Sequence, residues 1–387
     1  MSVQQSRLRA VFMRGGTSKA VMFHRADLPP DQAAWAPIFR AVMGSPDPYA
    51  RQLDGMGGGV SSVSKVCIVG PSTHPDADVD YTFAQVAVKD SRVDFSAICG
   101  NMASAIGPFA IDEGLVPCPP DGPATVRIHN TNTSKIIHAQ FHVQGGVAAV
   151  DGEMSLDGVT GSGSPIRLDF LHPGGPSTGR LLPTGHACDT LDVPGVGAVT
   201  ASLIDAANPC VFVEARALGA TGIELPGDIE GNPELLRKLE AVRRAASVAM
   251  GLAPDAETAG SKASLPLVAL VAAPADAPLL SGVTLAATQS DILVRMMSTG
   301  QPHRAVPLTG ALCLAVACRI PGSLPAQLVA TAGPDQDIRI GHPSGVIVVA
   351  ASVEHQGDTV QARHASAYRT ARRLFAGEVY YRTSIAR

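Results

Sequence analysis

The pattern of apolar and polar positions divides the first half of the chain into short strands and two helices. Apolar residues dominate 8–13 and 20–23, on either side of RGGTSK, which predicts a strand, a tight turn and a second strand. The apolar spacing over 31–43 predicts an amphipathic helix that ends at Gly44. Short apolar or alternating stretches at 66–69, 80–88 and 125–150 predict further strands.

The segment ICGNMASAIGPFAIDEG, residues 98–114, predicts a second helix, which begins beside Cys99 and Gly100. A thiol next to the free N–H groups of a helix N-terminus has a lowered pKa, and the same helix end attracts anions. Gly100 would let the backbone approach a ligand closely. The alternative is a structural cysteine on a core helix, because free cysteines are among the most buried residues.

The second half of the chain repeats this order of elements. A strand, a turn and a strand (202–213), a helix (233–250), a strand (267–271) and a short helix (309–318) recur about 200 residues later. We therefore expect two similar domains, residues 1–184 and 185–387, that face each other. Residues 370–381 predict a basic helix leading into an aromatic strand, and the last residues of the chain, about 15, are expected to cross back to the first domain.

The duplication has a chemical consequence. Each half would supply one helix N-terminus beside a glycine, Gly100 in the first and Gly310 in the second. If both line a cleft, they form a pocket with two anion-binding ends, which suits a small-molecule di- or tricarboxylate.

Composition narrows the class of protein. The net charge of −4 argues against a nucleic-acid surface, and no stretch has the apolar length of a membrane helix. The seven cysteines contain no C-x-x-C pair, which favours reduced thiols in the cytoplasm. The N-terminal residues lack the apolar core of a signal peptide. We therefore expect a cytoplasmic protein with no nucleic-acid or membrane partner, and a homodimer is left open.

Two further groups of residues are candidates for chemistry. Lys65 ends a Gly- and Ser-rich loop at the start of an apolar strand, where an amine can serve as a base, although a solvated loop lysine is the ordinary alternative. Positive charge for carboxylates is expected from the RGGTSK turn and from His303 and Arg304, unless these are a solvated turn and a surface pair. No P-loop or dinucleotide fingerprint is present, and neither a cofactor nor a metal is expected.

With these motifs in place, the chain resembles the PrpF-like family, which includes 2-methylaconitate cis–trans isomerase and 4-oxalomesaconate tautomerase. The resemblance extends over nearly the full length. The specific matches are MRGGTSKAVMF (13–23), MGSPDPYARQLDGMGGGVSSVSKV (43–66), DADVDYTFAQVAV (76–88) and CGNMASAIGPFAIDEGLV (99–116), and the looser ones are HRAVPLTGALCLA (303–315) and GHPSG (341–345).

The resemblance implies the α/β fold of diaminopimelate epimerase: two pseudo-symmetric domains, each a curled sheet around a central helix. It also implies a cofactor-independent proton shift in an unsaturated tricarboxylate, such as 2-methylaconitate, aconitate or 4-oxalomesaconate. The family's base and its paired thiol fall on Lys65 and Cys99. Substrate contacts are expected from Arg14, Ser18, Lys19, Ser64, Gly100, Asn101, Met102, His303, Arg304, Thr309 and Gly310.

Two alternatives remain at this point. Epimerases of this fold carry a cysteine on each central helix, and here the second position aligns with Thr309, which cannot act as the second acid–base group at neutral pH. An amino-acid racemase or epimerase would therefore need Cys313 as its second thiol. A non-catalytic accessory protein to an aconitase-type dehydratase is the other alternative.

Overall fold

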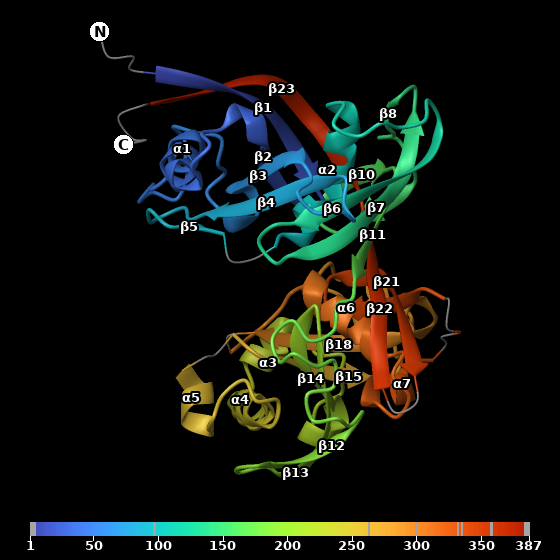
Figure 1. The fold of residues 1–387 in the computed structure, drawn as a ribbon. Helices are drawn as coiled ribbons and strands as arrows, with labels where there is room; N and C mark the ends of the chain where they lie inside the picture. Colours follow the sequence, from blue (N-terminus) through green and yellow to red (C-terminus); the bar gives the residue numbers. More distant parts are fainter. Residues whose placement is uncertain are drawn as a thin grey trace. The chain divides into compact units, whose positions relative to one another are not determined.

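The computed structural model describes residues 5–95, 98–261, 264–298, 300–330, 333, 336–356 and 359–382 (Figure 1). The chain forms two compact units. The first unit contains residues 1–169 and 368–387, and the second contains residues 170–367. The first boundary thus lies at 169/170, whereas the sequence placed it at 184. The segment 170–184 is held to the second unit, where Asp205 N–H donates to Leu181 O and Leu181 packs in the core.

The first unit is a mixed sheet with one helix on each face, together with a separate two-stranded sheet. Its strands and helices are β1 (Gln5–Gly15), β2 (Ser18–His24), α1 (Trp35–Met43), β3 (Lys65–Pro71), β4 (Val79–Val86), β5 (Val93–Asp94), α2 (Gly100–Asp112), β6 (Gly122–Asn130), β7 (Lys135–Gln144), β8 (Val147–Ala148), β9 (Met154–Leu156), β10 (Val159–Gly163), β11 (Ile166–Leu171, which continues into the second unit) and β23 (Ala371–Arg382).

The second unit has a sheet of the same kind, with additional short helices and a separate two-stranded sheet. Its elements are β12 (Asp189–Val193), β13 (Gly197–Ala206), β14 (Asn208–Glu214), α3 (Pro226–Glu230), α4 (Pro233–Ala249), α5 (Ala256–Ser261), β15 (Leu267–Ala272), β16 (Ala277–Pro278), β17 (Thr284–Leu285), β18 (Ile292–Ser298), β19 (Gln301–Pro302), α6 (Leu308–Ala317), α7 (Leu324–Leu328), β20 (Ile338–His342), β21 (Gly345–Gln356) and β22 (Thr359–Arg369, which ends in the first unit).

Strand pairing confirms the internal duplication. In the first unit the order is β23-β1-β2-β3-β4-β6-β7, and in the second it is β12-β13-β14-β15-β18-β20-β21. The sequence of antiparallel and parallel pairings is the same in both rows: β2–β3 and β4–β6 are parallel, as are β14–β15 and β18–β20. The two helices α1 and α4 occupy the same crossover, between β2 and β3 and between β14 and β15.

Each sheet curls around one central helix. Residues 102–111 of α2 and 310–317 of α6 are buried on all sides, as expected of a helix enclosed by a core. The other face of each sheet packs on α1 or on α4, in separate apolar clusters. The predicted fold class, an α/β chain of two similar halves with curled sheets and central helices, is therefore confirmed (Figure 1).

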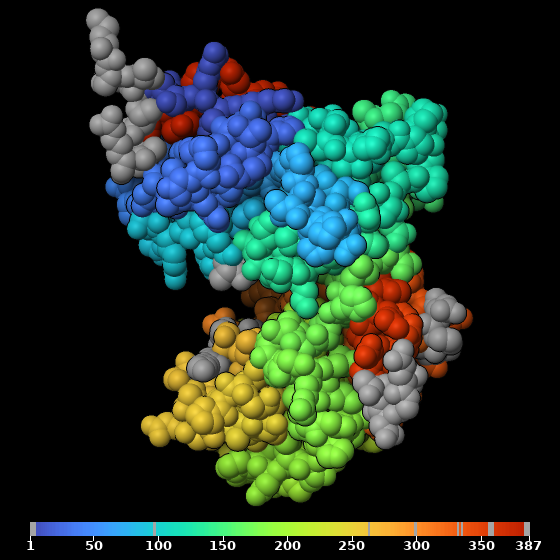
Figure 2. Space-filling view, viewed as in Figure 1, coloured from blue at the N-terminus to red at the C-terminus, as the bar shows by residue number. Residues whose placement is uncertain are grey.

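The C-terminal segment differs from its prediction. Residues 371–382 form the strand β23, and the basic helix expected there is absent. This strand pairs antiparallel with β1 from Gln5 opposite Arg382 to Gly15 opposite Ala371. Figure 2 shows the red C-terminal strand at the surface beside the blue N-terminal one. The return to the first domain thus involves residues 371–382, and residues 383–387 of the predicted crossing lie outside the described part.

Among the described residues, no helix combines the length and the apolar character that crossing a bilayer requires.

Candidate active site

The strand β3 presents alternate side chains to the two helices of the first unit. Val66 and Ile68 pack on α1 with Trp35 and Phe39. Lys65 and Cys67 therefore point to the opposite face, where α2 lies, because side chains alternate along a strand. The cross-strand partners Gln85, Phe83 and Tyr81 on β4 share that face.

Lys65 has a fixed and largely dry environment. The residue is only 8 % exposed, its Nζ lies 2.5 Å from Gln85 Oε1, and it lies 5.0 Å from the centre of the Phe83 ring. Gln85 Nε2 donates to the carbonyls of Ser64 and Ser61, at 2.9 and 3.1 Å, so its oxygen is directed at the amine. The amine is thus oriented by a neutral acceptor and an aromatic ring.

Cys99 is the N-cap of α2 and is half-buried. Its carbonyl accepts the N–H of Ala103 at 2.9 Å and the hydroxyl of Tyr81 at 3.5 Å. Tyr81 Oη in turn lies 3.8 Å from Cys67 Sγ. Tyr81 therefore connects the start of α2 with the face of β3 that carries Lys65.

The electrostatics of Cys67 place Lys65 and Cys99 in one neighbourhood. Burial is the main cause that raises the pKa of the Cys67 thiol, the Cys99 thiol raises it further, and Lys65 opposes the shift. Burial, followed by Cys67 and Cys99, also raises the pKa of Tyr81. The structure thus brings Lys65 and Cys99 together around Cys67 and Tyr81.

The turn between β1 and β2 lies against the first turn of α2. A Cβ atom at Gly15 would be 2.7 Å from Asn101 O and 3.1 Å from Met102 Cα, so only glycine fits there without a shift of backbone. Asn101 Nδ2 donates to Thr17 Oγ1 at 3.0 Å. The RGGTSK motif is therefore a support for the helix N-terminus that carries Cys99.

Gly15→Ala is expected to lower the free energy of unfolding by about 1–3 kcal/mol, because the added methyl group meets backbone atoms that cannot move independently. Denaturant unfolding measures the change. The matched control is Gly377→Ala on β23, where a Cβ atom would have no neighbour within 4 Å. Equal stability of the two variants would contradict the close contact.

The motif's polar residues separate onto two faces. Ser18 is buried on the face of α2, in the same direction as Gly15 and Lys65, since Gly15 pairs with Ser18. Arg14 pairs with Lys19 on the opposite face, where Lys19 Nζ lies 5.7 Å from the Phe12 ring centre. Arg14 Nη1 donates to Gly16 O and Thr370 O, and burial, aided by Arg372, lowers its pKa.

The predicted site residues of the first unit thus fall into groups. Lys65, Ser18, Cys99, Gly100 and Asn101 gather at the α2 N-terminus, whereas Arg14 and Lys19 do not point there. The Ser64 hydroxyl donates to Val86 O and accepts from Gln52 Nε2, so it holds the glycine-rich loop.

Met102 is fully buried and offers a ligand only its backbone N–H.

The second unit repeats the hairpin-to-helix contact. Asn208 Nδ2, at the start of β14, lies 3.5 Å from Thr309 Oγ1, as Asn101 meets Thr17 in the first unit. Thr309 is the second residue of α6 and Pro307 is its N-cap, so Thr309 corresponds to Asn101 and Pro307 to Cys99. The sequence paired Thr309 with Cys99; the structure corrects this register by two residues.

The other candidates of the second unit lie around α6. His303 is half-buried, and its backbone N–H donates to Met296 O. Burial lowers the pKa of its imidazole. Arg304 is exposed, and its carbonyl accepts from Ser344 Oγ at 2.7 Å. Gly310 packs against the Met296 thioether, so it is a packing residue.

Cys313 is a core residue of the second unit. It is 0 % exposed, and its thiol donates to Ile204 O at 3.5 Å. It also lies beside Cys210, whose pKa is raised by burial and by Cys313. A thiol enclosed in this way cannot reach a ligand, which removes the second acid–base group that a racemase would need.

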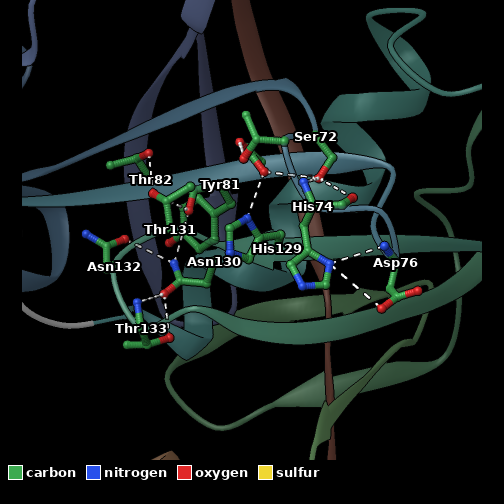
Figure 3. A network of polar contacts seen from close by, with 12 residues as sticks. Ser72, His74, Asp76, Tyr81, Thr82, His129, Asn130, Thr131, Asn132 and Thr133 are labelled. Atoms are coloured by element: carbon green, nitrogen blue, oxygen red, sulfur yellow. Dashed lines mark hydrogen bonds and ion pairs between the residues drawn. The ribbon is translucent and has the colours of Figure 1, made fainter.

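Hydrogen bonds from residues 130–132 hold the backbone of Tyr81 and Phe83 on β4, and the sequence patterns did not predict them. The Tyr81 carbonyl accepts from Thr131 N–H at 3.0 Å and from Asn130 Nδ2 at 3.1 Å (Figure 3). Asn132 bonds both the N–H and the carbonyl of Phe83, at 2.8 and 2.9 Å, and donates to Phe95 O at 2.7 Å. The HNTNTS motif (129–134) was the available signal, because Asn and Thr bond backbone groups in turns.

Asn132→Ala is expected to cost about 2–4 kcal/mol of unfolding free energy, since it leaves part-buried backbone groups of Phe83 and Phe95 without their partner. Thr82→Val is the matched control: it removes only an exposed hydroxyl pair with Thr131, and a change within about 0.5 kcal/mol is expected. Denaturant unfolding compares the two, and similar losses would contradict the bridging role of Asn132.

Comparisons with known proteins find relatives of this chain over nearly its whole length. A family model described as PrpF protein matches residues 5–382. A 3-methylitaconate isomerase of Eubacterium barkeri is 41 % identical over 97 % of both chains. A 2-methyl-aconitate isomerase of Shewanella oneidensis is 40 % identical over 97 % of both chains, and a (4E)-oxalomesaconate Delta-isomerase of a Novosphingobium strain is 38 % identical over 96 % of both. A crystal structure of a methylitaconate-delta-isomerase is 40 % identical in sequence and matches this structure with a TM-score of 0.92. The match covers 98 % of that chain and 100 % of this one.

Proposed function

Because the chain belongs to the PrpF family, we propose that it is an isomerase that moves one proton along an unsaturated di- or tricarboxylic acid, with Lys65 and Cys99 as the groups that carry the proton. The observation that carries this proposal is the convergence of an amine and a thiol at one helix N-terminus. Cys99 and Lys65 both act on the pKa of the buried Cys67 thiol. Cys67 and Cys99 act on the pKa of Tyr81, which bonds the Cys99 carbonyl.

The chemistry follows from this arrangement. In its neutral form Lys65 takes a proton from a carbon next to the double bond of the substrate, so a C–H bond breaks and an N–H bond forms. The electron pair spreads over the conjugated carboxylate as a dienolate. The free N–H groups of the first turn of α2 stabilise this negative charge, as an oxyanion hole does.

The second proton transfer completes the reaction. Cys99 gives its proton to the far carbon and moves the double bond, or rotation about the transient single bond precedes reprotonation and gives the cis–trans isomer. The Lys65 ammonium then returns a proton to the Cys99 thiolate, directly or through solvent, so both groups regain their starting states. Substrate and product have the same atoms and the same oxidation state.

The relatives' printed names define the candidate substrates. The names give 3-methylitaconate, 2-methylaconitate and 4-oxalomesaconate, and we add aconitate as the parent acid of 2-methylaconitate. Aconitate and 2-methylaconitate differ by one methyl group, which a pocket distinguishes by about 1–3 kcal/mol, whereas 3-methylitaconate has only two carboxylates. All seven cysteines are free, which supports a cytoplasmic setting for the reaction.

The test is a panel of these acids incubated with the purified protein in heavy water and followed by proton NMR. We expect at least one acid to isomerise and to take up deuterium at the carbon that reacts. The absence of both turnover and exchange across the panel would overturn the proposal and would favour an accessory protein.

A further inference from the structure

Arg369 is a buried cation at the N-terminus of α2. It follows Tyr368 at the end of β22 and lies in the first unit, with 9 % of its surface exposed. Its Nε donates to Asn101 Oδ1 at 3.0 Å, and its Nη1 donates to the carbonyl of Tyr368 at 2.8 Å. Its Cδ would lie 3.1 Å from a Cβ atom at Gly16, so the side chain runs along the β1–β2 turn.

The charge of this guanidinium has no carboxylate partner among the described residues. Both of its hydrogen-bond acceptors are neutral, and Nη2 has none in the described part of the chain. Burial alone lowers the pKa of Arg369, to about 10. Burial also lowers the pKa of the buried Arg295 in the second unit to about 10, but there the carboxylate of Glu224 opposes the shift, whereas no carboxylate of the described residues does so at Arg369.

A buried arginine without a counter-ion is costly, because burial of a charge is tolerated when the charge is paired. Here the cation also stands next to free N–H groups at the N-terminus of α2, which attract negative charge themselves. Two independent sources of positive potential therefore meet at Asn101, on the face that carries Lys65 and Cys99.

We propose that Arg369, with Asn101 and the first N–H groups of α2, forms a carboxylate subsite that binds one carboxylate of the substrate beside Lys65 and Cys99. This inference rests on the proposed function and deepens it. Arg369 holds the acid through charge-assisted hydrogen bonds, and its partner Asn101 fixes the plane of the guanidinium. Arg369, and not Arg14, is therefore the arginine that binds a substrate carboxylate at the N-terminus of α2.

The first test measures binding without catalysis. Propane-1,2,3-tricarboxylate is saturated and has no allylic proton, so calorimetry with it reports binding alone. Arg369→Met is expected to weaken its affinity roughly 100-fold, and Arg369→Lys by less, because a lysine keeps the charge but loses the planar fork. Arg382→Gln, on the exposed end of β23, is the control and should bind as the parent protein does. Unchanged affinity in Arg369→Met would overturn the subsite.

The second test fills the subsite from within the chain. Asn101→Asp places a carboxylate beside Arg369, where Asn101 Oδ1 already accepts from Nε. The variant is expected to raise the thermal midpoint and to lose affinity for propane-1,2,3-tricarboxylate. The rise should vanish in the Asn101→Asp, Arg369→Met double variant, which separates the ion pair from a general helix effect. If Asn101→Asp raises the thermal midpoint equally in the parent protein and in Arg369→Met, the claim that Arg369 lacks a counter-ion is contradicted.

The outcomes separate this inference from the proposed function. If the acids isomerise and Arg369→Met keeps the parent KM, the subsite is wrong while the isomerase stands. If no acid on the panel turns over, yet binding of propane-1,2,3-tricarboxylate depends on Arg369, the subsite stands and the proposed reaction fails. A raised KM with a smaller change in kcat supports both.

Discussion

Lys65→Met is expected to lower kcat/KM for isomerisation by about 10³-fold, because it removes the base but preserves the length and apolar stem of the side chain. Lys65 is held by Gln85 and Phe83 in a dry setting, and among the described residues no other lysine lies on this face of β3 or β4. Deuterium uptake by the substrate should fall by the same factor, since the lost step is the removal of the proton.

The measurement combines steady-state rates with exchange in heavy water. Lys89→Met is the control, because Lys89 is exposed and lies beyond the end of β4. It should keep the parent rate. Exchange at the parent rate in Lys65→Met would show that another group removes the proton.

Cys99→Ala is expected to lower isomerisation by about 10²–10⁴-fold, the usual contribution of a positioned acid or base. If the thiol only delivers the proton to the far carbon, exchange at the first carbon continues while isomerisation stops. If exchange is lost as well, Cys99 takes part in the removal of the proton. Both outcomes place it in the reaction.

The control for Cys99 is another half-buried cysteine of the same unit. Cys118 donates to Gly146 O at 3.6 Å, away from the start of α2, and Cys118→Ala should keep the parent activity. Isomerisation at the parent rate in Cys99→Ala would exclude the thiol from the reaction. It would leave Lys65 to move the proton alone.

Local patterns in the sequence were sufficient for the parts of the fold that depend on neighbouring residues. The hairpin around Gly15, the helix that begins at Cys99 and the strand of Lys65 all follow from apolar spacing and from turn chemistry over about ten residues. The duplication was visible because the same order of such patterns occurs twice. The residue-by-residue correspondence of the two central helices was not visible in the sequence. Gly100 is the first residue of α2, whereas Gly310 is the third residue of α6.

Features that depend on distant residues were missed. The stretch 371–382 contains good helix formers, but pairing with β1 makes it a strand, which shows how tertiary context overrides local propensity. Arg369 was missed for a related reason. Nothing in its neighbours indicates burial, which results from Asn101 and the β1–β2 turn far away in the sequence.

The pairing of β23 with β1 also constrains the order of events during synthesis. While the ribosome is still translating the second unit, residues 5–15 have emerged without their partner, so β1 is an open sheet edge. Nascent chains therefore expose a template for aggregation until residues 371–382 are released. Completion of the first unit is therefore coupled to synthesis of a segment encoded more than 350 positions after β1.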